Sequence, residues 1–419
     1  MSKPSKGFPK GFYWGASTAA HQVEGGHDNQ WSEWELAHAQ ELAQTADERL
    51  GWLPNYKSIR GQATQPENYV SGRGVAHEKL HRQDFDLLQS LNMNAFRFSI
   101  EWSKLEPEEG RWDVAAMAYY RDYLAELRER GIEPFVTLWH WTLPRWFADK
   151  GGFAKRSNVA YFERFAERVG RELLGDVTYI ITLNEPNVYA SFSYITGEWV
   201  PQRRNIYVGW RVYANLAEAH RRVYRSLKKQ NPARMIGIAQ QLGDSRPKQP
   251  DSRLIRLMIR FGEYGWNWWF MERIKRQMDF AGCNYYFTEY RDRFGRMDNP
   301  KEPVSDMGWY MEPSGLQAVL EKTWVRYGKP VIVTENGLAD AADAQRQWWL
   351  EQSIEAMQAA LNNGVDLRGY IHWSLLDNFE WKYGWWPKFG LIEVDRDNKM
   401  KRTVRPSARW LAKTIKNIS

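Results

Sequence analysis

Two glutamates, Glu185 and Glu335, lie at the polar ends of apolar segments that have the same form. Glu185 follows the segment Tyr179–Asn184, and Glu335 lies near the end of the segment Pro330–Asn336. A continuous apolar run that ends at a turn signal predicts a strand buried on both faces, as in parallel sheets covered by helices. Parallel α/β folds keep their chemistry at the C-terminal ends of the strands. We therefore expect both carboxyl groups at one face of one sheet.

A pair of carboxyl groups in one site suits the cleavage of an acetal. The retaining route needs two carboxyls on opposite sides of the anomeric carbon, one protonated and one ionised. For either segment alone, the alternative is a core strand followed by a helix-capping or solvated acid. The recurrence of the same form at Glu185 and Glu335 favours a catalytic pair.

The two segments also carry a family resemblance. Thr-Leu-Asn-Glu-Pro, residues 182–186, and Val-Thr-Glu-Asn-Gly, residues 333–337, resemble the acid/base and nucleophile motifs of glycoside hydrolase family 1, the β-glucosidase and β-galactosidase family. Further motifs of this family recur along nearly the whole chain. The resemblance implies a retaining β-glycosidase that hydrolyses terminal β-linked sugars through a covalent glycosyl-enzyme, without a cofactor or metal. It implies that Glu185 is the general acid/base and Glu335 the nucleophile.

The different roles of the two carboxyl groups require different pKa values. Partial burial and the like charge of Glu335 should raise the pKa of Glu185, whereas a cation and donors should keep Glu335 ionised. Arg97, a charge within an apolar strand, is a candidate cation, although a structural ion pair in the barrel is the alternative. Tyr286 matches the tyrosine donor of the family, although a tyrosine at a strand end often serves packing alone.

Polar and aromatic residues at successive strand ends are the candidates for sugar binding. Buried hydroxyl groups need hydrogen-bond partners, and sugar rings need an aromatic floor. A lone histidine or glutamine would more often be structural, but their arrival at successive strand ends favours binding. The resemblance implies glycone contacts from Gln22 and His140, a 2-hydroxyl contact from Asn184, stacking on Trp373, distal hydroxyl contacts from Glu380 and Trp381, and further pocket contacts from Trp141, Tyr286 and Phe389.

Glu380 also predicts which sugars the site rejects. Family members that take 6-phosphorylated sugars generally carry a small hydroxyl residue at this place. A carboxylate would bind neutral hydroxyls and repel a phosphate, because two unit charges about 4 Å apart interact by roughly 4 kcal/mol at an effective dielectric near 20. We expect Lys382 and Lys388 to face solvent and to be screened. The sequence therefore predicts an enzyme for free β-glucosides and β-galactosides.

Alternating strand and helix patterns predict the scaffold for these residues. Asp113 and Gly131 are expected to cap the helix between them. The alternation predicts an α/β fold, a (β/α)8 TIM barrel, with one catalytic domain over residues 1–419. The expected strands lie within Phe12–Thr18, Asn94–Ile100, Glu133–His140, Tyr179–Asn184, Met235–Gln241, Phe280–Tyr286, Pro330–Asn336 and Leu367–Leu375. The expected helices are Glu78–Leu91, Val114–Arg130, Val159–Leu174, Tyr207–Gln230, Ile255–Met278, Leu316–Tyr327, Ala344–Asn363 and Pro406–Ile418.

Three connections are candidates for the rim of the barrel mouth. The stretch His27–Arg73 is rich in Gly, Gln, Asn and Trp and departs from the family pattern, so we expect a long irregular loop over the mouth. Tyr194–Asn205 and Tyr290–Pro313 are the other two candidates.

The composition argues against several other kinds of partner. The net charge is +7, but basic residues are interspersed with acidic ones, which argues against a nucleic-acid-binding face. No stretch of about 20 apolar residues is present, so no membrane span is expected. The single cysteine, Cys283, and the polar N-terminus, residues 1–7, predict a cytoplasmic protein. The 23 tryptophans favour flat aromatic faces that bind small β-glycosides or short oligosaccharides.

Three rival functions fit the sequence less well. A non-catalytic sugar-binding barrel would be expected to lose one of the two glutamates, and both are present. A thioglucosidase usually lacks the acid/base carboxylate, which Glu185 supplies. A phosphate-binding barrel enzyme would need a glycine-rich anion site after the seventh or eighth strand, for which Gly337 alone is weak support.

Overall fold

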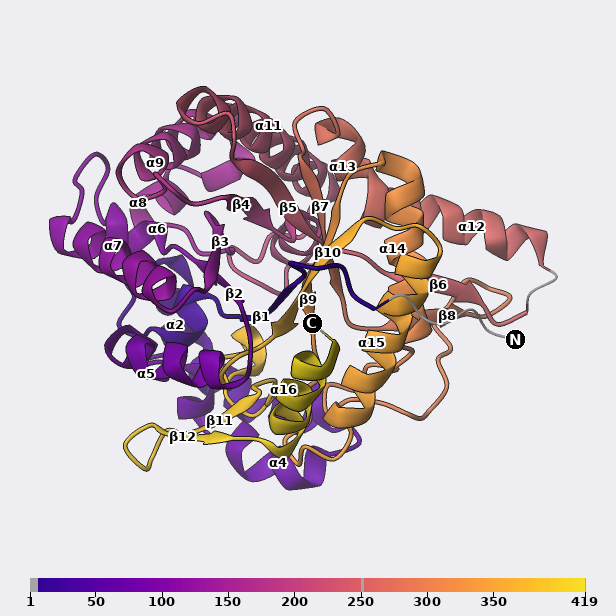
Figure 1. The fold of residues 1–419 in the computed structure, drawn as a ribbon. Helices are drawn as coiled ribbons and strands as arrows, with labels where there is room; N and C mark the ends of the chain where they lie inside the picture. The colour runs from indigo at the N-terminus through magenta and orange to yellow at the C-terminus, as the bar shows by residue number, and fades with distance from the viewer. Residues whose placement is uncertain (1–6, 250–251, 419) are drawn as a thin grey trace.

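The chain folds into a closed barrel of eight parallel strands, seen in a computed structural model that describes residues 7–249 and 252–418 (Figure 1). The strands follow the order β1-β10-β9-β7-β5-β4-β3-β2 around the barrel. Each strand lies within one of the predicted apolar segments, so the predicted barrel is confirmed. The strands are β1 (Tyr13–Ser17), β2 (Ala95–Ser99), β3 (Glu133–Thr137), β4 (Tyr179–Asn184), β5 (Met235–Gln241), β7 (Phe280–Tyr285), β9 (Val331–Asn336) and β10 (Leu367–Trp373).

A ring of helices surrounds the strands (Figure 1). The predicted caps of one helix are confirmed: the Asp113 side chain accepts from the N–H of Ala116 at 2.8 Å, and Gly131 follows the C-terminal end with a φ of +69°. The larger helices of the ring are α5 (His77–Ser90), α7 (Val114–Glu129), α9 (Val159–Glu172), α11 (Ile206–Gln230), α14 (Ser314–Tyr327), α15 (Arg346–Asn362) and α16 (Pro406–Ile418). Two small sheets, β6 (Asp244–Pro247) with β8 (Thr288–Arg291) and β11 (Ile392–Asp395) with β12 (Lys401–Val404), lie outside the barrel.

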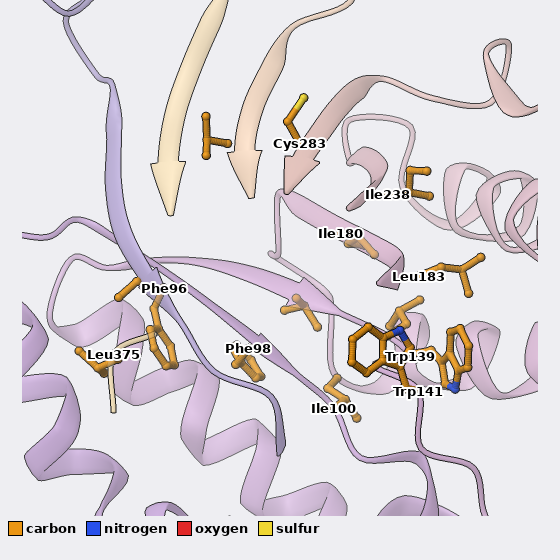
Figure 2. Close-up of a cluster of buried hydrophobic side chains, with 14 of the residues drawn as sticks. Phe96, Phe98, Ile100, Trp139, Trp141, Ile180, Leu183, Ile238, Cys283 and Leu375 are labelled. Carbon is orange, nitrogen blue, oxygen red and sulfur yellow. The ribbon is translucent and has the colours of Figure 1, made fainter. Parts of the chain in front are cut away.

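The strands separate an inner core from an outer core because successive side chains point to opposite faces. Phe96 and Phe98 of β2 belong to the outer core, with the side chains that Figure 2 shows on the neighbouring strands. Ala95 belongs to the inner core, which also holds Phe135. The same alternation places Arg97 inside the barrel, where a charge needs partners.

One predicted helix, Ile255–Met278, is wrong in its continuity. The structure divides it into α12 (Arg253–Glu263), a π-helical turn η5 (Tyr264–Trp268) and α13 (Trp269–Ile274). The carbonyl of Trp266 in the turn accepts hydrogen bonds from the side chains of Asn187, at 3.3 Å, and Gln240, at 2.9 Å. These bonds come from residues outside the helix. The spacing of apolar residues within 255–278 therefore gives no indication of them.

The stretch His27–Arg73 is helical, so the prediction of an irregular loop is wrong. It forms α2 (Gln30–Gln44), α3 (Ala46–Leu50), α4 (Tyr56–Ala63) and the 3-10 turn η1 (Pro66–Tyr69). Asn29 caps α2, and Trp31 is buried beneath it. The stretch lies at the barrel mouth as expected, because Leu50, Leu53 and Ile59 pack in one buried cluster with Trp373 and Phe389, which line the mouth cavity.

The described residues contain no helix that combines the length and the apolar character needed to cross a membrane. The expected cytoplasmic location rested in part on the N-terminal residues, and residues 1–6 lie outside the described part of the chain.

Candidate active site

Glu185 comes directly after β4, at the C-terminal mouth of the barrel. Its backbone is left-handed, with φ 42° and ψ 60°, and its N–H donates to the Ala239 carbonyl of β5 at 2.8 Å. A non-glycine residue in this region carries strain of roughly 1–3 kcal/mol, which is common at functional sites. Pro186 then begins α10 (Pro186–Ala190), since proline suits the first position of a helix. The turn fixes the Glu185 carboxyl at the barrel mouth.

Glu335 lies one residue before the end of β9 and is only 4% exposed. One carboxylate oxygen accepts a hydrogen bond from Nη1 of Arg97, and the other accepts one from the Tyr286 hydroxyl at 2.6 Å. Gly337 follows the strand, where a side chain would overlap the carbonyl oxygen of Trp373 on β10. Glu335 is therefore held between a buried cation and a hydroxyl donor.

Two asparagines connect the surroundings of the two carboxyl groups. Asn184 accepts from Nη2 of Arg97 at 2.6 Å and donates to Nε2 of His140 at 3.1 Å. Asn284 donates to Glu185 at 2.8 Å and lies 3.3 Å from the same Asn184 oxygen. The network orients both glutamates through direct hydrogen bonds between buried side chains.

The environments of the two glutamates differ in the way that acid and nucleophile require. Burial, followed by the negative charge of Glu335, raises the pKa of Glu185 well above its usual value. The hydrogen bond from Asn284 and the charge of Arg97 act in the opposite direction but leave the pKa raised. The cation itself contacts Glu335 and not Glu185. One carboxyl group thus keeps its proton to higher pH, and the other has a direct counter-charge.

Three of the predicted glycone residues carry a buried polar atom without a hydrogen-bond partner among the described residues. These atoms are Oε1 of Gln22, Nδ1 of His140 and Oε2 of Glu380. Unpaired buried polar atoms cost about 1–3 kcal/mol each, so a ligand with several hydroxyl groups would relieve this cost. Gln22 is fixed because its amide nitrogen donates to the carbonyl of Phe379 at 2.7 Å.

His140 carries a neutral imidazole ring in this site. Burial, followed by the charge of Arg97, lowers its pKa well below the usual value. Because Asn184 donates to Nε2, the proton of the neutral ring lies on Nδ1, the atom without a partner.

Glu380 differs from the prediction in its charge, and the two nearby lysines differ in their place. Burial, followed by the charge of Glu335, raises the pKa of Glu380 to about 8, so the group is mainly a neutral acid at pH 7. Lys382 lines the cavity and forms an ion pair with Glu198, and Lys388 is half-buried. The sequence did not indicate that residues 380–389 fold back into the barrel mouth, where several of them line the cavity.

The predicted residues surround one cavity of about 230 Å³. The rings of Trp373 and His140 stack with centroids 5.8 Å apart, and Trp381 lies 5.0 Å from Trp141. Gln22, Arg97 and Asn184 adjoin this lining: Arg97 bonds to Glu335, Asn184 bonds to His140, and Gln22 bonds to the backbone of Phe379, next to Glu380. The predicted residues that line the cavity are His140, Trp141, Glu185, Tyr286, Glu335, Trp373, Glu380, Trp381 and Phe389.

Several site residues were not predicted from the sequence. Asn284 lies one residue before the end of an apolar strand, much as Asn184 lies at the end of another, so a similar pattern could have found it. Met307 and Trp309 come from the predicted rim 290–313, and Glu198 and Trp199 come from the predicted rim 194–205. No local pattern distinguishes these four residues from others in the same loops.

Comparison with known proteins agrees with the resemblance of the motifs. The family model for glycosyl hydrolase family 1 matches residues 4–276 and 270–419. The chain is 32% identical to β-glucosidase A of Thermotoga maritima, with 98% of each chain covered. It is 28% identical to a β-galactosidase of Sulfolobus acidocaldarius, with 96% of this chain and 93% of the relative covered. The solved β-glucosidase of Thermotoga maritima in complex with a methoxycarbonyl-substituted glucoimidazole aligns with a TM-score of 0.85 at 29% identity, with 99% of each chain covered.

Proposed function

The chain belongs to glycosyl hydrolase family 1 and is a glycoside hydrolase of the β-glucosidase and β-galactosidase type, and we propose that it cleaves terminal β-glucosides and β-galactosides by a retaining double displacement. The observation that carries the proposal is the unequal environment of Glu185 and Glu335 within one cavity.

In the first step, a carboxylate oxygen of Glu335 attacks the anomeric carbon and the bond to the aglycone oxygen breaks. Glu185 donates its proton to that oxygen, so the aglycone leaves as an alcohol. Arg97 and Tyr286 hold Glu335 in position during the attack. The product is an α-linked glycosyl ester on Glu335.

In the second step, Glu185 is ionised and takes a proton from a water molecule on the side that the aglycone has left. The water oxygen attacks the anomeric carbon, and Glu335 leaves as a carboxylate. Two inversions give net retention of the β configuration. Asn184 binds the 2-hydroxyl of the sugar in this proposal; its hydrogen bonds with Arg97 and Asn284, which contact Glu335 and Glu185, support that role.

A panel of 4-nitrophenyl β-glycosides tests the proposed activity. We expect turnover of the glucoside and the galactoside, because Gln22 and Glu380 offer unpartnered atoms for a 4-hydroxyl in either orientation. Binding of the sugars without any turnover would instead support a non-catalytic sugar-binding barrel.

The pH profile is expected to be bell-shaped. The acid limb follows from the mechanism, because only an ionised carboxylate can attack the anomeric carbon. The raised pKa of Glu185 means that its proton is present below that pKa and is lost as the pH rises through it, so the rate falls on the alkaline side. The measurement is kcat/KM for 4-nitrophenyl β-glucoside as a function of pH.

A matched pair of variants assigns the alkaline limb of this profile. Glu185→Gln, which cannot ionise, should remove the limb from the kcat/KM profile of its residual activity on 4-nitrophenyl β-glucoside. Glu380 has a pKa of about 8 and is the rival source of the limb. Loss of the limb in Glu380→Gln together with its persistence in Glu185→Gln would reassign it to Glu380.

Sugars that carry a 6-phosphate are expected to be poor substrates. Of the described residues that line the cavity, Lys382 is the one Lys or Arg, and it is already paired with Glu198. A buried phosphate without a free cation should cost about 3 kcal/mol or more, which is about 100-fold or more in kcat/KM. The measurement compares 4-nitrophenyl β-glucoside with its 6-phosphate.

The discrimination against the 6-phosphate should increase with pH. Glu380 is protonated below its pKa of about 8 and gains a negative charge as the pH rises through it. Glu380→Gln, which cannot ionise, is the matched control and should remove this dependence above about pH 7, where the phosphate is already mostly a dianion. A preference for the phosphate at any pH between 6 and 9 would contradict our account of the pocket.

We also propose that residues 1–419 act as one catalytic domain in the cytoplasm. The barrel strands extend from β1 to β10 along the chain, which supports a single unit, and the lone Cys283 is buried, which supports a reducing compartment. Cell fractionation tests the location, and recovery of the activity outside the cytoplasm would contradict it.

A further inference from the structure

The indole ring of Trp381 in the cavity wall contacts two histidines, one that lines the cavity and one that does not. His140, which lines the cavity, lies nearly parallel to the indole, with ring centroids 6.1 Å apart and an interplanar angle of 14°. His21 is also nearly parallel to it, at 5.6 Å and 11°, but lies outside the cavity lining. Offset aromatic rings at such distances attract one another. His21 therefore supports Trp381 without forming part of the cavity wall.

A buried carboxyl group anchors His21. Nε2 of His21 and Oε1 of Glu35 are hydrogen-bonded at 2.7 Å, and the two residues are only 2% and 1% exposed. The other carboxyl oxygen of Glu35 accepts from the N–H and the hydroxyl of Ser71, at 2.9 and 2.7 Å. Nδ1 of His21 lies 3.1 Å from the amide nitrogen of Asn29. The imidazole ring thus has a polar partner at each nitrogen, which fixes the plane that it presents to Trp381.

Glu35 belongs to α2, a helix that the sequence did not predict. Trp31 lies four residues earlier, hence on the same face of the helix, and its ring is 4.7 Å from that of Trp381. Gln30, at the start of the helix, donates through its amide to the carbonyl of Trp141 at 3.0 Å. Because Trp141 and Trp381 both line the cavity, α2 is attached to two tryptophans of the sugar pocket.

Both of these tryptophans have a left-handed backbone, with a φ of 76° for Trp141 and 48° for Trp381. Residues with a side chain rarely adopt this conformation, which persists only where the surrounding contacts enforce it. The contacts from α2 and His21 are among those that act on the two residues. The position of the Trp381 indole therefore depends on groups outside the cavity as well as on its own loop.

Two predicted sugar ligands are direct neighbours of this assembly in the chain. Glu380 precedes Trp381, and Gln22 follows His21 within α1 (Ala20–Val23). Each of these two ligands has a buried side-chain oxygen without a hydrogen-bond partner among the described residues. Binding of a hydroxyl group requires such atoms to be held within about 0.5 Å of the productive position. A displacement of Trp381 or His21 would therefore weaken the contacts with the distal hydroxyl groups of a sugar.

We propose that His21 and Glu35 are positioning residues, which hold Trp381 and the adjoining ligands in place for the distal hydroxyl groups of the sugar. Neither residue lines the cavity, so each acts through its neighbours. Through Glu35, the segment 27–73 takes part in building the sugar pocket as well as covering the barrel mouth. The proposal rests on the β-glycosidase activity proposed above and names residues on which its choice of sugar depends.

A comparison of deoxy sugars tests this role. The substrates are 4-nitrophenyl β-glucoside and its 2-deoxy and 4-deoxy analogues, and the measured quantity is the factor by which each missing hydroxyl group lowers kcat/KM. The factor for the 4-hydroxyl should be about 100-fold or more in the wild type, because a site built to bind a hydroxyl group rejects the analogue without it.

Two variants should lower this factor. His21→Gln keeps a donor for Glu35 but lacks the ring, and the factor for the 4-hydroxyl should fall by about tenfold, within the range found for coupled groups. Glu35→Ala should lower it as well, because His21 loses its anchor. The factor for the 2-hydroxyl, which Asn184 binds in the proposed mechanism, should stay within about twofold of the wild-type value in both variants.

His77→Gln is the matched control. His77 and Asp84 form a similar buried pair, with Nδ1 and Oδ2 2.8 Å apart, but neither residue lines the cavity or contacts Trp381. Each factor is a ratio measured on one preparation, so it does not depend on the fraction of folded enzyme. A variant that is merely less stable keeps the wild-type factors. An unchanged 4-hydroxyl factor in both His21→Gln and Glu35→Ala, or an equal fall in His77→Gln, would overturn the proposal.

A binding measurement separates this proposal from the proposed activity. If 4-nitrophenyl β-glucoside is not cleaved, the proposed activity fails, and the ratio of the Kd values for 4-deoxyglucose and glucose, measured by titration calorimetry, replaces the kinetic factor. That ratio should fall in His21→Gln and Glu35→Ala and stay constant in His77→Gln. If the glucoside is cleaved but the factors are equal in all variants, the activity stands and the positioning role is wrong.

Discussion

Glu335→Ala is expected to reduce kcat on 4-nitrophenyl β-glucoside by about 10⁴-fold or more, the scale of loss when a covalent nucleophile is removed. No other described carboxyl group contacts Arg97 and Tyr286 in the way that Glu335 does. Glu185 lies nearby, but its carboxyl accepts from Asn284 and forms no ion pair with Arg97, so it does not occupy the position of the missing carboxylate. Stopped assays with an activated leaving group measure this loss.

The effect must be separated from loss of the fold. Removing Glu335 leaves the buried guanidinium of Arg97 without its partner, which costs about 3–5 kcal/mol. Glu335→Gln keeps an acceptor for Arg97 and should lose the same activity with less loss of stability. Glu106→Gln is a matched control, since Glu106 is also buried and ion-paired, with Arg164, but lies outside the cavity. Near-normal activity in Glu335→Gln would remove Glu335 from the reaction.

Glu185→Ala is expected to slow the breakdown of the glycosyl-enzyme by about 10²- to 10⁴-fold, the usual contribution of a general base. The first step should be nearly unchanged for a 2,4-dinitrophenyl β-glucoside, because this leaving group needs little protonation. A burst of dinitrophenol followed by slow turnover is therefore expected. Pre-steady-state absorbance measures both phases.

Azide distinguishes the roles of the two glutamates. In Glu185→Ala, azide should enter the space left by the carboxyl group, attack the α-linked intermediate and give a β-glycosyl azide at an increased rate. The same anion should not restore turnover to Glu335→Gln. An α-glycosyl azide from Glu185→Ala would reverse the assignment of acid/base and nucleophile.

The barrel and the position of Glu185 and Glu335 at its mouth were predictable because their signals are local. An apolar run that ends in Asn-Glu-Pro or Glu-Asn-Gly contains its strand, its end and its functional group in a few residues. Arg97 was conspicuous for the same reason, since a charge in an apolar strand must find partners inside the protein.

Features that depend on long-range packing were not predictable. The break after α12 depends on side chains of Asn187 and Gln240 that bind the Trp266 carbonyl. The raised pKa of Glu380 depends on burial by loops distant in sequence, and so does the inward position of Lys382. The helices in residues 30–63 are favoured by contacts with the barrel mouth as well as by their own pattern.

Trapping the covalent intermediate tests the central claim most directly. A 2,4-dinitrophenyl 2-deoxy-2-fluoro-β-glucoside forms the glycosyl-enzyme through its reactive leaving group, and the fluorine slows both steps so that the intermediate accumulates. Peptide mass spectrometry then locates the sugar. We predict one fluoroglucosyl group on Glu335 of each active chain; a label on Glu185, or inactivation without any label, would contradict the proposed double displacement.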